Sequence, residues 1–465
     1  MLYKNLTYSF LPRAISIITG PLIISLLTKN LSVQAYGLWT TLFSFGFLIT
    51  AIASLGLQKV LSILIPGKKK NLQVKYLRNI LIFEVFVYLT IASIIYSILK
   101  IFDLSLVEIN SNELSLFFLA FLFNLIFSEI GRFFNYTGNI SLRITLTCIE
   151  KILEITVLFS IFYTFNELNI IILSFSYLLI FFLIFILHLY FYFKKFSFSS
   201  LSLNLKLIQI GLKIGIPFFF TDLIWRLFTQ IDQYLMIYFE KNFELGLYNY
   251  TFKITNFVYL LGSTVIWIIY PYLAKSFNQR KKLKFKIFLK VQYFFSNIIS
   301  LNVSLILIIF WNFLTILIAN EQYIFKQNFL LILIFNSLLL INLYISQQEL
   351  VLNKMVKEIL FSYFIGLLFN FIFDLILIPK YGSIGAALSS NLGLLVIIVS
   401  QFIYSLNKKY LINSILIIFS FMLINFIFIN FNISIKIFFF LFSLISLIYL
   451  IFYRDKIIRV LSLKF

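Results

Sequence analysis

Three ionisable side chains lie in the middle of one apolar stretch. Residues 207–239 are apolar enough to cross a bilayer, yet they include Asp222, Arg226 and Asp232. An ionised side chain at mid-membrane costs at least about 2.5–3.5 kcal/mol on insertion scales, so such residues usually face a bundle interior or a wet cavity. Asp222 and Arg226 are four residues apart, so on one helix they share a face and can pair. The pattern indicates either transport machinery or an Asp–Arg pair that only locks two helices together.

The helix that carries these charges is predicted to be irregular. Pro217 lies inside it, and Gly211 and Gly215 come just before. Proline removes a helical hydrogen bond and clashes with the preceding turn. We therefore expect a kink or a break at this point, and a bent membrane helix with buried charge is typical of a transporter.

Composition places the chain among all-α integral membrane proteins with little mass outside the bilayer. Hydrophobic residues make up 62% of the chain and charged residues 12%, with a mean hydropathy of +1.02. The one cysteine, Cys148, excludes an intrachain disulfide, and the one histidine, His188, lies in an apolar run where packing is its usual role. No Cys, His and carboxylate cluster has metal-site spacing, so we expect neither a metal nor a cofactor. The N-terminus has no small-residue cleavage site, so the first apolar run should stay as an uncleaved span.

Apolar windows of about 20 residues predict about 14 transmembrane helices. The windows cover residues 8–28, 36–58, 79–99, 114–134, 144–164, 169–193, 207–239, 247–271, 287–318, 327–350, 359–378, 384–405, 411–430 and 434–453. The loops between them alternate between strongly basic and mostly acidic. By the positive-inside rule the basic loops are cytoplasmic, and both termini lie inside. The net charge of +21 therefore reflects topology. Because the basic residues are spread over separate loops, we expect no nucleic-acid partner.

Two short segments suggest an internal repeat. LTKNLSVQAYGLW (27–39) and FEKNFELGLYNYT (239–251) align at an offset of 212 residues. With six spans per repeat, both halves enter the membrane in the same sense. This predicts two six-helix lobes in a parallel pseudo-twofold repeat, with a cavity between them. We expect one lobe over residues 1–206, the second over 207–406, and helices 13 and 14 with a cytoplasmic tail over 407–465.

Further charged residues lie inside the predicted spans. Lys59, Lys213 and Glu129 lie near cytoplasmic ends, where lysines can snorkel to the interface. Arg13 lies beside Pro12 in the first span, where it can snorkel or line the cavity. Deeper positions, a turn or two inside their spans, are held by Glu84, Glu150, Lys151, Glu154, Lys253 and Asp374. The surplus of deep cations suits an anionic cargo.

Three segments resemble the polysaccharide-biosynthesis transporters. NFIFDLILIPKYGSIGAALSS (370–390) looks like that family's turn between spans 11 and 12. GIPFFFTDLIWRLFTQIDQYLMIYF with the following ELGLYNYTFKI (215–254) is similar to its spans 7 and 8, and LSVQAYGLWTTLFSFGFLITAIASLGL (31–57) to its span 2. This family includes the O-antigen (Wzx-type) flippases of the multidrug/oligosaccharidyl-lipid/polysaccharide exporter superfamily. The resemblance extends to about residue 405 and implies a MATE-like fold.

The resemblance implies a flippase of the bacterial inner membrane. It would move an undecaprenyl-diphosphate-linked oligosaccharide, such as an O-antigen (lipopolysaccharide), capsule or exopolysaccharide repeat unit, to the periplasmic leaflet by alternating access. One guanidinium group can bind two phosphate oxygens at once through two parallel hydrogen bonds. The predicted cargo contacts are Arg226, Arg13, Lys253 and Lys151. The candidates for binding a coupling proton or sodium ion are Asp222, Asp232, Glu154 and Asp374. Expected partners are the lipid-linked oligosaccharide, membrane lipid, the coupling ion, and polysaccharide polymerase and chain-length proteins.

Other functions remain open at this point. A drug or metabolite-cation antiporter of the same superfamily would share the fold, but a cationic cargo favours an acidic cavity, which Arg226 opposes. A flippase for the peptidoglycan lipid precursor is a closer alternative, because its cargo is also a prenyl pyrophosphate. An enzyme, such as a polymerase or acyltransferase, fits less well, because the outer loop over residues 100–113 is short and acidic and His188 is alone. We therefore expect a transporter and no enzymatic activity.

Overall fold

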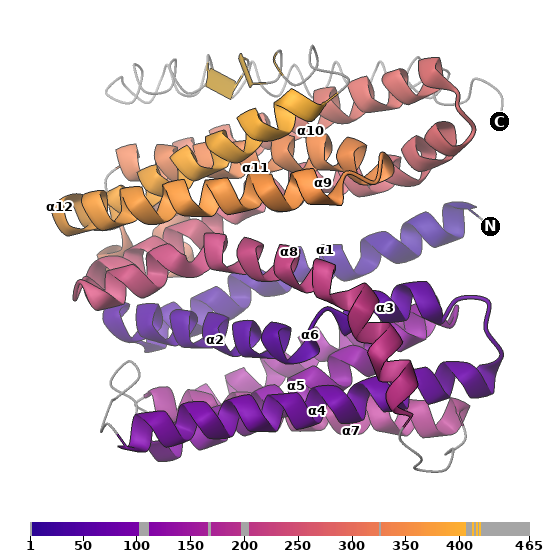
Figure 1. Cartoon of the computed structure of the whole chain (residues 1–465). Helices are drawn as coiled ribbons and strands as arrows, with labels where there is room; N and C mark the ends of the chain where they lie inside the picture. The colour runs from indigo at the N-terminus through magenta and orange to yellow at the C-terminus, as the bar shows by residue number, and fades with distance from the viewer. Residues whose placement is uncertain are drawn as a thin grey trace. The chain divides into compact units, whose positions relative to one another are not determined.

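The computed structural model describes residues 2–101, 111–165, 169–196, 204–324 and 327–405, with residues 412, 415, 416, 418 and 419. This part of the chain is helical and contains no β-strand (Figure 1). The all-α prediction is therefore confirmed. The predicted spans at 411–430 and 434–453 lie outside the described residues apart from those five positions, so the total of 14 spans stays a prediction.

The described residues form twelve α-helices and one short 3-10 helix, η1 (Glu321–Tyr323). The α-helices are α1 (Leu2–Asn30), α2 (Val33–Ser54), α3 (Leu57–Leu64), α4 (Lys70–Ile101), α5 (Ser111–Tyr136), α6 (Ile140–Thr164), α7 (Ile170–Lys195), α8 (Leu205–Tyr238), α9 (Asn242–Asn278), α10 (Lys282–Ile318), α11 (Gln327–Leu352) and α12 (Val356–Tyr404). Within the described ranges, nine are long and apolar enough to cross a membrane. Each of the first twelve predicted windows overlaps a helix, and α12 covers two of them.

The two spans within α12 meet at a break. Gly382 has φ 54° and ψ −127°, a backbone conformation that favours glycine. The carboxylate of Glu244 on α9 accepts a 2.7 Å hydrogen bond from the backbone N–H of Ser383. A carboxylate at the start of a helix satisfies an otherwise unpaired N–H and complements the helix dipole. The predicted turn between spans 11 and 12 is thus a capped break, and a Cβ at Gly382 would overlap the Glu244 carboxylate.

The second predicted span, residues 36–58, is wrong as a single helix. α2 ends at Ser54, Leu55 and Gly56 have φ of 45° and 76°, and α3 then begins at Leu57. A Cβ on Gly56 would overlap the carbonyl of Gly215 on α8, so the break lies directly against that helix. Both pieces are apolar, and an apolar window therefore does not detect the break.

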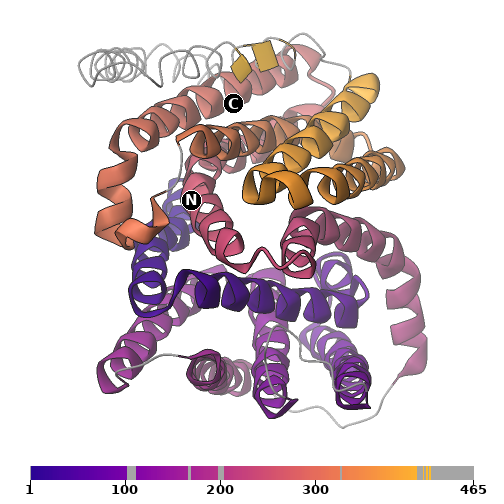
Figure 2. The ribbon, with the colours of Figure 1, turned by 90° about the vertical axis from the view of Figure 1, so that its left-hand side faces the viewer.

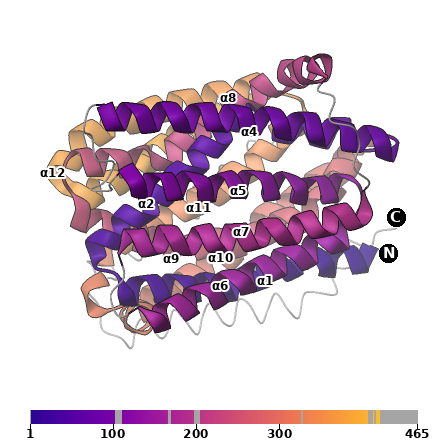
Figure 3. The same cartoon turned by 90° about the horizontal axis from the view of Figure 1, so that it is seen from below.

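The chain divides into two compact units. Unit 1 comprises Met1–Asn249 and Phe371–Ser383, and unit 2 comprises Tyr250–Asn370 and Ile384–Phe465. In unit 1, α5 packs against both α4 and α7, and α1 packs along α6 (Figure 3). The predicted lobes at 1–206 and 207–406 and their repeat stay predictions.

A hydrophobic core in unit 1 holds α3 in place. Leu57, Val60 and Leu61 of α3 are fully buried, and they belong to one cluster with Leu77 of α4 and Phe133 of α5. Figure 2 shows this half of the chain, in indigo to magenta, from one end. Because three apolar residues of this two-turn helix are anchored in the core, Lys59 and Ser62 lie on its exposed face, together with Ile63.

α8 is one continuous helix with Pro217 inside it, so of the two predicted alternatives, a kink or a break, the break is not observed. The helix bends along its length, which agrees with a kink (Figure 1). Its start is fixed by Asn204, whose side chain accepts from the N–H of Leu207 at 3.3 Å. The backbone N–H of Asn204 in turn donates to the side chain of Asn79 on α4 at 2.7 Å. α8 is thereby tied to the bundle at the end that precedes the proline.

Unit 2 is joined by neutral polar side chains. Asn297 on α10 and Asn342 on α11 exchange amide hydrogen bonds of 3.3 and 3.1 Å. The hydroxyl of Ser337 on α11 donates to the carbonyl of Thr255 on α9 at 3.0 Å. Amide and hydroxyl pairs satisfy one another inside an apolar bundle without the cost of burying charge.

Candidate functional site

An ion pair links α3 to α8 in unit 1. The ammonium of Lys59 lies 2.9 Å from a carboxylate oxygen of Asp222, and the two side chains are 45% and 43% exposed. The spacing predicted that Asp222 can pair with Arg226 on the same helix, whereas the structure pairs Asp222 with Lys59 on another helix. Because α2 ends before it, Lys59 lies on the separate short helix α3 and forms an ion pair with Asp222 there. The prediction that its side chain extends to the membrane interface did not include this partner.

Arg226 lies one turn further along α8 and is half-buried. Its Nη1 donates to the carbonyl of Phe47 on α2 at 3.5 Å, the long end of hydrogen-bond geometry. Its charge also interacts with those of Asp222 and Arg132. A guanidinium has five N–H donors, so one long hydrogen bond uses little of its capacity.

Arg132 on α5 forms an ion pair with Glu129 one turn before it. The Glu129 side chain is fully buried, whereas that of Arg132 is 32% exposed. Glu84 on α4 is also fully buried, and its charge interacts with those of Glu129 and Arg132. We call Lys59, Arg132 and Arg226 the cationic cluster. Sequence analysis missed Arg132, although its i, i+3 spacing from Glu129 was a usable signal.

Lys151 and Glu154 of α6 form a further ion pair. Lys151 bonds Glu154 at 2.7 Å, and the phenol of Tyr177 on α7 donates to the same carboxylate at 3.3 Å. Both Lys151 and Glu154 were predicted site residues, one for cargo and one for ion coupling. The structure pairs them with each other.

The lone histidine is bonded within the bundle. His188 on α7 is fully buried, with Nε2 3.2 Å from a carboxylate oxygen of Glu150. Arg143 on α6 bonds the same oxygen at 2.5 Å. The Nδ1 of His188 lies 2.9 Å from the carbonyl of Ile184. This geometry agrees with a packing role for His188, and Arg143 is another cation that sequence analysis missed.

The other predicted site residues lie elsewhere. Asp232 is 2% exposed and accepts hydrogen bonds from the phenol of Tyr248 and from the backbone N–H of Gln233. Asp374 on α12 is fully buried in unit 1, and Lys253 on α9 is half-buried in unit 2. The side chain of Arg13 lies outside the described residues. Of the predicted site residues, Arg226 belongs to the cationic cluster, and Asp222 contacts the cluster through Lys59.

Over the described ranges, no three or more histidine, cysteine, aspartate or glutamate side chains are grouped as a metal site would require. The expectation that the protein holds no metal stays a prediction.

Nine described helices that are long and apolar enough to span a bilayer, with ionisable side chains among them, indicate a multi-pass membrane protein. Residues 2–277 match the family described as polysaccharide biosynthesis protein, and the chain belongs to that family. No curated protein matches the sequence.

Solved structures share the fold. The lipid II flippase MurJ, in an inward closed conformation, superposes with a TM-score of 0.72 at 17% identity, covering 97% of this chain and 99% of that one. The Vibrio cholerae MATE transporter VcmN gives 0.59 at 15% identity, with 86% and 96% covered. A MOP-superfamily transporter from Pyrococcus furiosus gives 0.56 at 12%, with 90% and 96% covered. The MATE-like fold prediction is confirmed, and these proteins are transporters and flippases, which fits a non-enzymatic role.

Proposed function

We propose that this protein is a flippase for a polyprenyl-diphosphate-linked oligosaccharide of the bacterial inner membrane, with both termini in the cytoplasm. Its cargo is the repeat unit of an O-antigen, capsule or exopolysaccharide. Polymerase and chain-length proteins would use the delivered unit. The observation that carries the proposal is the cationic cluster of Lys59, Arg132 and Arg226.

The exposure of the side chains favours an anionic ligand. Glu84 and Glu129 are fully buried, while Lys59 and Arg132 are 45% and 32% exposed. The accessible side of the cluster is therefore more cationic than a count of its charges suggests. A diphosphate carries about two negative charges, and a guanidinium fork binds phosphate oxygens through two parallel hydrogen bonds.

Asp222 offers a way to couple transport to an ion. In this structure its carboxylate forms an ion pair with Lys59 and interacts with the charge of Arg226. A diphosphate that binds these cations would compete with Asp222 for them. The displaced carboxylate would then need another positive partner, which a proton or sodium ion supplies.

Substitution of Arg226 tests the proposal. We expect Arg226→Ala to abolish surface polysaccharide in cells while the protein stays in the membrane. Arg226→Lys should recover only part of the activity, because an ammonium keeps the charge but lacks the fork. Lys213→Ala, an exposed lysine on the same helix, serves as the matched control and should export normally. Normal export by Arg226→Ala would reject the proposed role.

A second pair of variants separates transport from a structural lock. Lys59→Met alone leaves Asp222 without its ion-pair partner. If the pair only joins α3 to α8, the double variant Lys59→Met with Asp222→Asn should export polysaccharide normally, because neither charge remains unpaired. If the pair serves cargo and ion binding, the double variant should fold and still fail to export.

The alternative cargo is the peptidoglycan lipid precursor, which the structural likeness to a lipid II flippase favours. Deletion of the gene distinguishes the two. Loss of surface polysaccharide in viable cells supports the first proposal. Lysis, with lipid precursor accumulating in the membrane, supports the alternative.

A further inference from the structure

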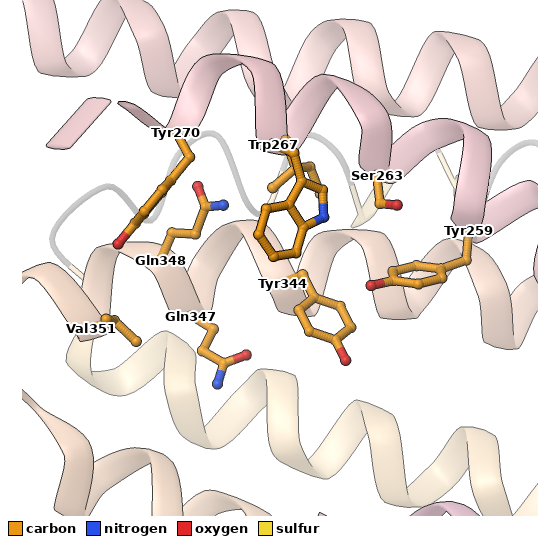
Figure 4. A pocket seen from close by; sticks show the side chains of 9 residues that line it. Tyr259, Ser263, Trp267, Tyr270, Tyr344, Gln347, Gln348 and Val351 are labelled. Carbon is orange, nitrogen blue, oxygen red and sulfur yellow. The ribbon is translucent and has the colours of Figure 1, made fainter. Parts of the chain in front are cut away.

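A cavity of about 290 Å³ lies between α9 and α11 in unit 2. Its wall includes Tyr259, Trp267 and Tyr270 from α9, and Tyr344, Gln347 and Gln348 from α11 (Figure 4). The residues that line it are all uncharged. The cavity therefore differs in chemistry from the cationic cluster of unit 1.

Four of the nine described residues that line the cavity are aromatic. The rings of Tyr259 and Tyr344 have centroids 5.2 Å apart, tilted by 35°. The Trp267 side chain lies beside them and is 60% exposed (Figure 4). Trp and Tyr combine a flat apolar face with a polar tip, so they bind ligands that are apolar on one face and polar at the edge.

The two glutamines supply hydrogen-bonding groups. Gln292 on α10 is fully buried, and its amide N–H donates to the carbonyl of Gln348 at 2.9 Å and to that of Ile266 at 3.1 Å. With its carbonyl held in this way, Gln348 directs its amide nitrogen toward Trp267 (Figure 4). The side chain of the neighbouring Gln347 makes no hydrogen bond to another described residue, so its amide can both donate and accept.

We propose that this cavity binds a sugar ring of the cargo. A pyranose has C–H faces that stack on aromatic rings, and hydroxyl groups at its edge that bond to amides and phenols. No charged side chain is among the described residues of the lining, which disfavours a cationic drug, and a prenyl chain would leave the fixed Gln348 amide without a hydrogen-bond partner. The volume of about 290 Å³ is just below the range of about 300–1,000 Å³ for small-molecule sites, which suits one or two rings.

The inference rests on the proposed function for the presence of a saccharide cargo, and it adds the residues that hold the sugar. Two soluble probes keep the two proposals apart. One is the oligosaccharide released by mild acid from the cell's own lipid-linked pool. The other is inorganic pyrophosphate, which carries the charge of the cargo without its sugar.

Calorimetric titration of the purified full-length protein in detergent tests the cavity. We expect Trp267→Leu and Gln348→Leu each to weaken oligosaccharide binding at least about tenfold, as truncating an anchoring residue does, and to leave pyrophosphate binding unchanged. Phe294→Leu, an exposed ring on α10, is the matched control and should bind the oligosaccharide normally. Gln347→Leu is a second test, because it breaks no hydrogen bond among the described residues.

Three results would overturn the inference. The wild type fails to bind the oligosaccharide, or Trp267→Leu and Gln347→Leu both bind it as tightly as the wild type. The third is that farnesol, a short prenyl alcohol, binds and loses affinity in Trp267→Leu but not in Gln348→Leu, which would assign the cavity to a prenyl chain. If the wild type binds the oligosaccharide but does not bind pyrophosphate, the diphosphate role of the cationic cluster is rejected and the sugar site is not.

Discussion

Arg132→Met should destabilise unit 1 by leaving buried carboxylates without a cation. Glu84 and Glu129 are both fully buried. Neither oxygen of Glu84, nor Oε2 of Glu129, has a hydrogen-bond partner among the described residues. Removing one partner of a buried ion pair costs about 3–5 kcal/mol. Because the Arg132 side chain is 32% exposed, water screens part of this interaction. We therefore expect a loss of about 2–4 kcal/mol in the free energy of unfolding.

The assay is the apparent melting temperature of the purified protein in detergent. Arg132→Met should melt several degrees below the wild type, and adding Glu129→Gln should restore most of the loss. Lys281→Met removes an exposed cation and should melt like the wild type. The reasoning is refuted if Arg132→Met melts with the wild type, or if Glu129→Gln fails to rescue it. The second result would mean that Arg132 stabilises the bundle through packing and not through charge.

Two further predictions concern local backbone and topology. Gly56 and Gly67 both have φ of 76°, but only Gly56 would place a Cβ against another helix. Gly56→Ala should therefore lower the melting temperature clearly more than Gly67→Ala, which should cost about 1–2 kcal/mol from the backbone alone; equal losses would contradict this packing. In a Cys148→Ala background, an impermeant thiol reagent added outside should label a cysteine at Glu321 and not one at Lys281; the reverse pattern would overturn the predicted topology.

The sequence was sufficient to predict the helices, because a membrane span needs only length and apolarity. All twelve windows up to residue 405 overlap helices. The break at Leu55 and Gly56 was not predictable in this way, because the signal is a positive φ at two positions of an apolar run. The turn at Gly382 was predicted because one apolar window ends at residue 378 and the next begins at 384, and because residues 370–390 resemble the family's turn between spans 11 and 12.

Partners of the charged residues were harder to predict than their presence. Spacing along one helix suggested that Asp222 meets Arg226, and it could not reveal Lys59, which is 163 positions away in sequence and on another helix. For the same reason the sequence could not predict the cationic cluster, because its members come from three helices, α3, α5 and α8. A pairing between helices depends on how the elements pack, and here it depends on the break that turns α3 against α8.

Unit 1 contains ion pairs at places where neutral polar pairs could also join helices, and this supports a role for charge beyond packing. Lys59–Asp222 and Arg132–Glu129 lie in unit 1 beside neutral pairs such as Thr41–Gln233, and α10 and α11 of unit 2 are joined by the amide pair Asn297–Asn342. If charge served only to join helices, neutral pairs would do so at lower desolvation cost, as they do in unit 2. Ion pairs with partly exposed cations are better explained by a ligand that carries charge. A cargo that is anionic at one end and a neutral sugar at the other needs both kinds of site.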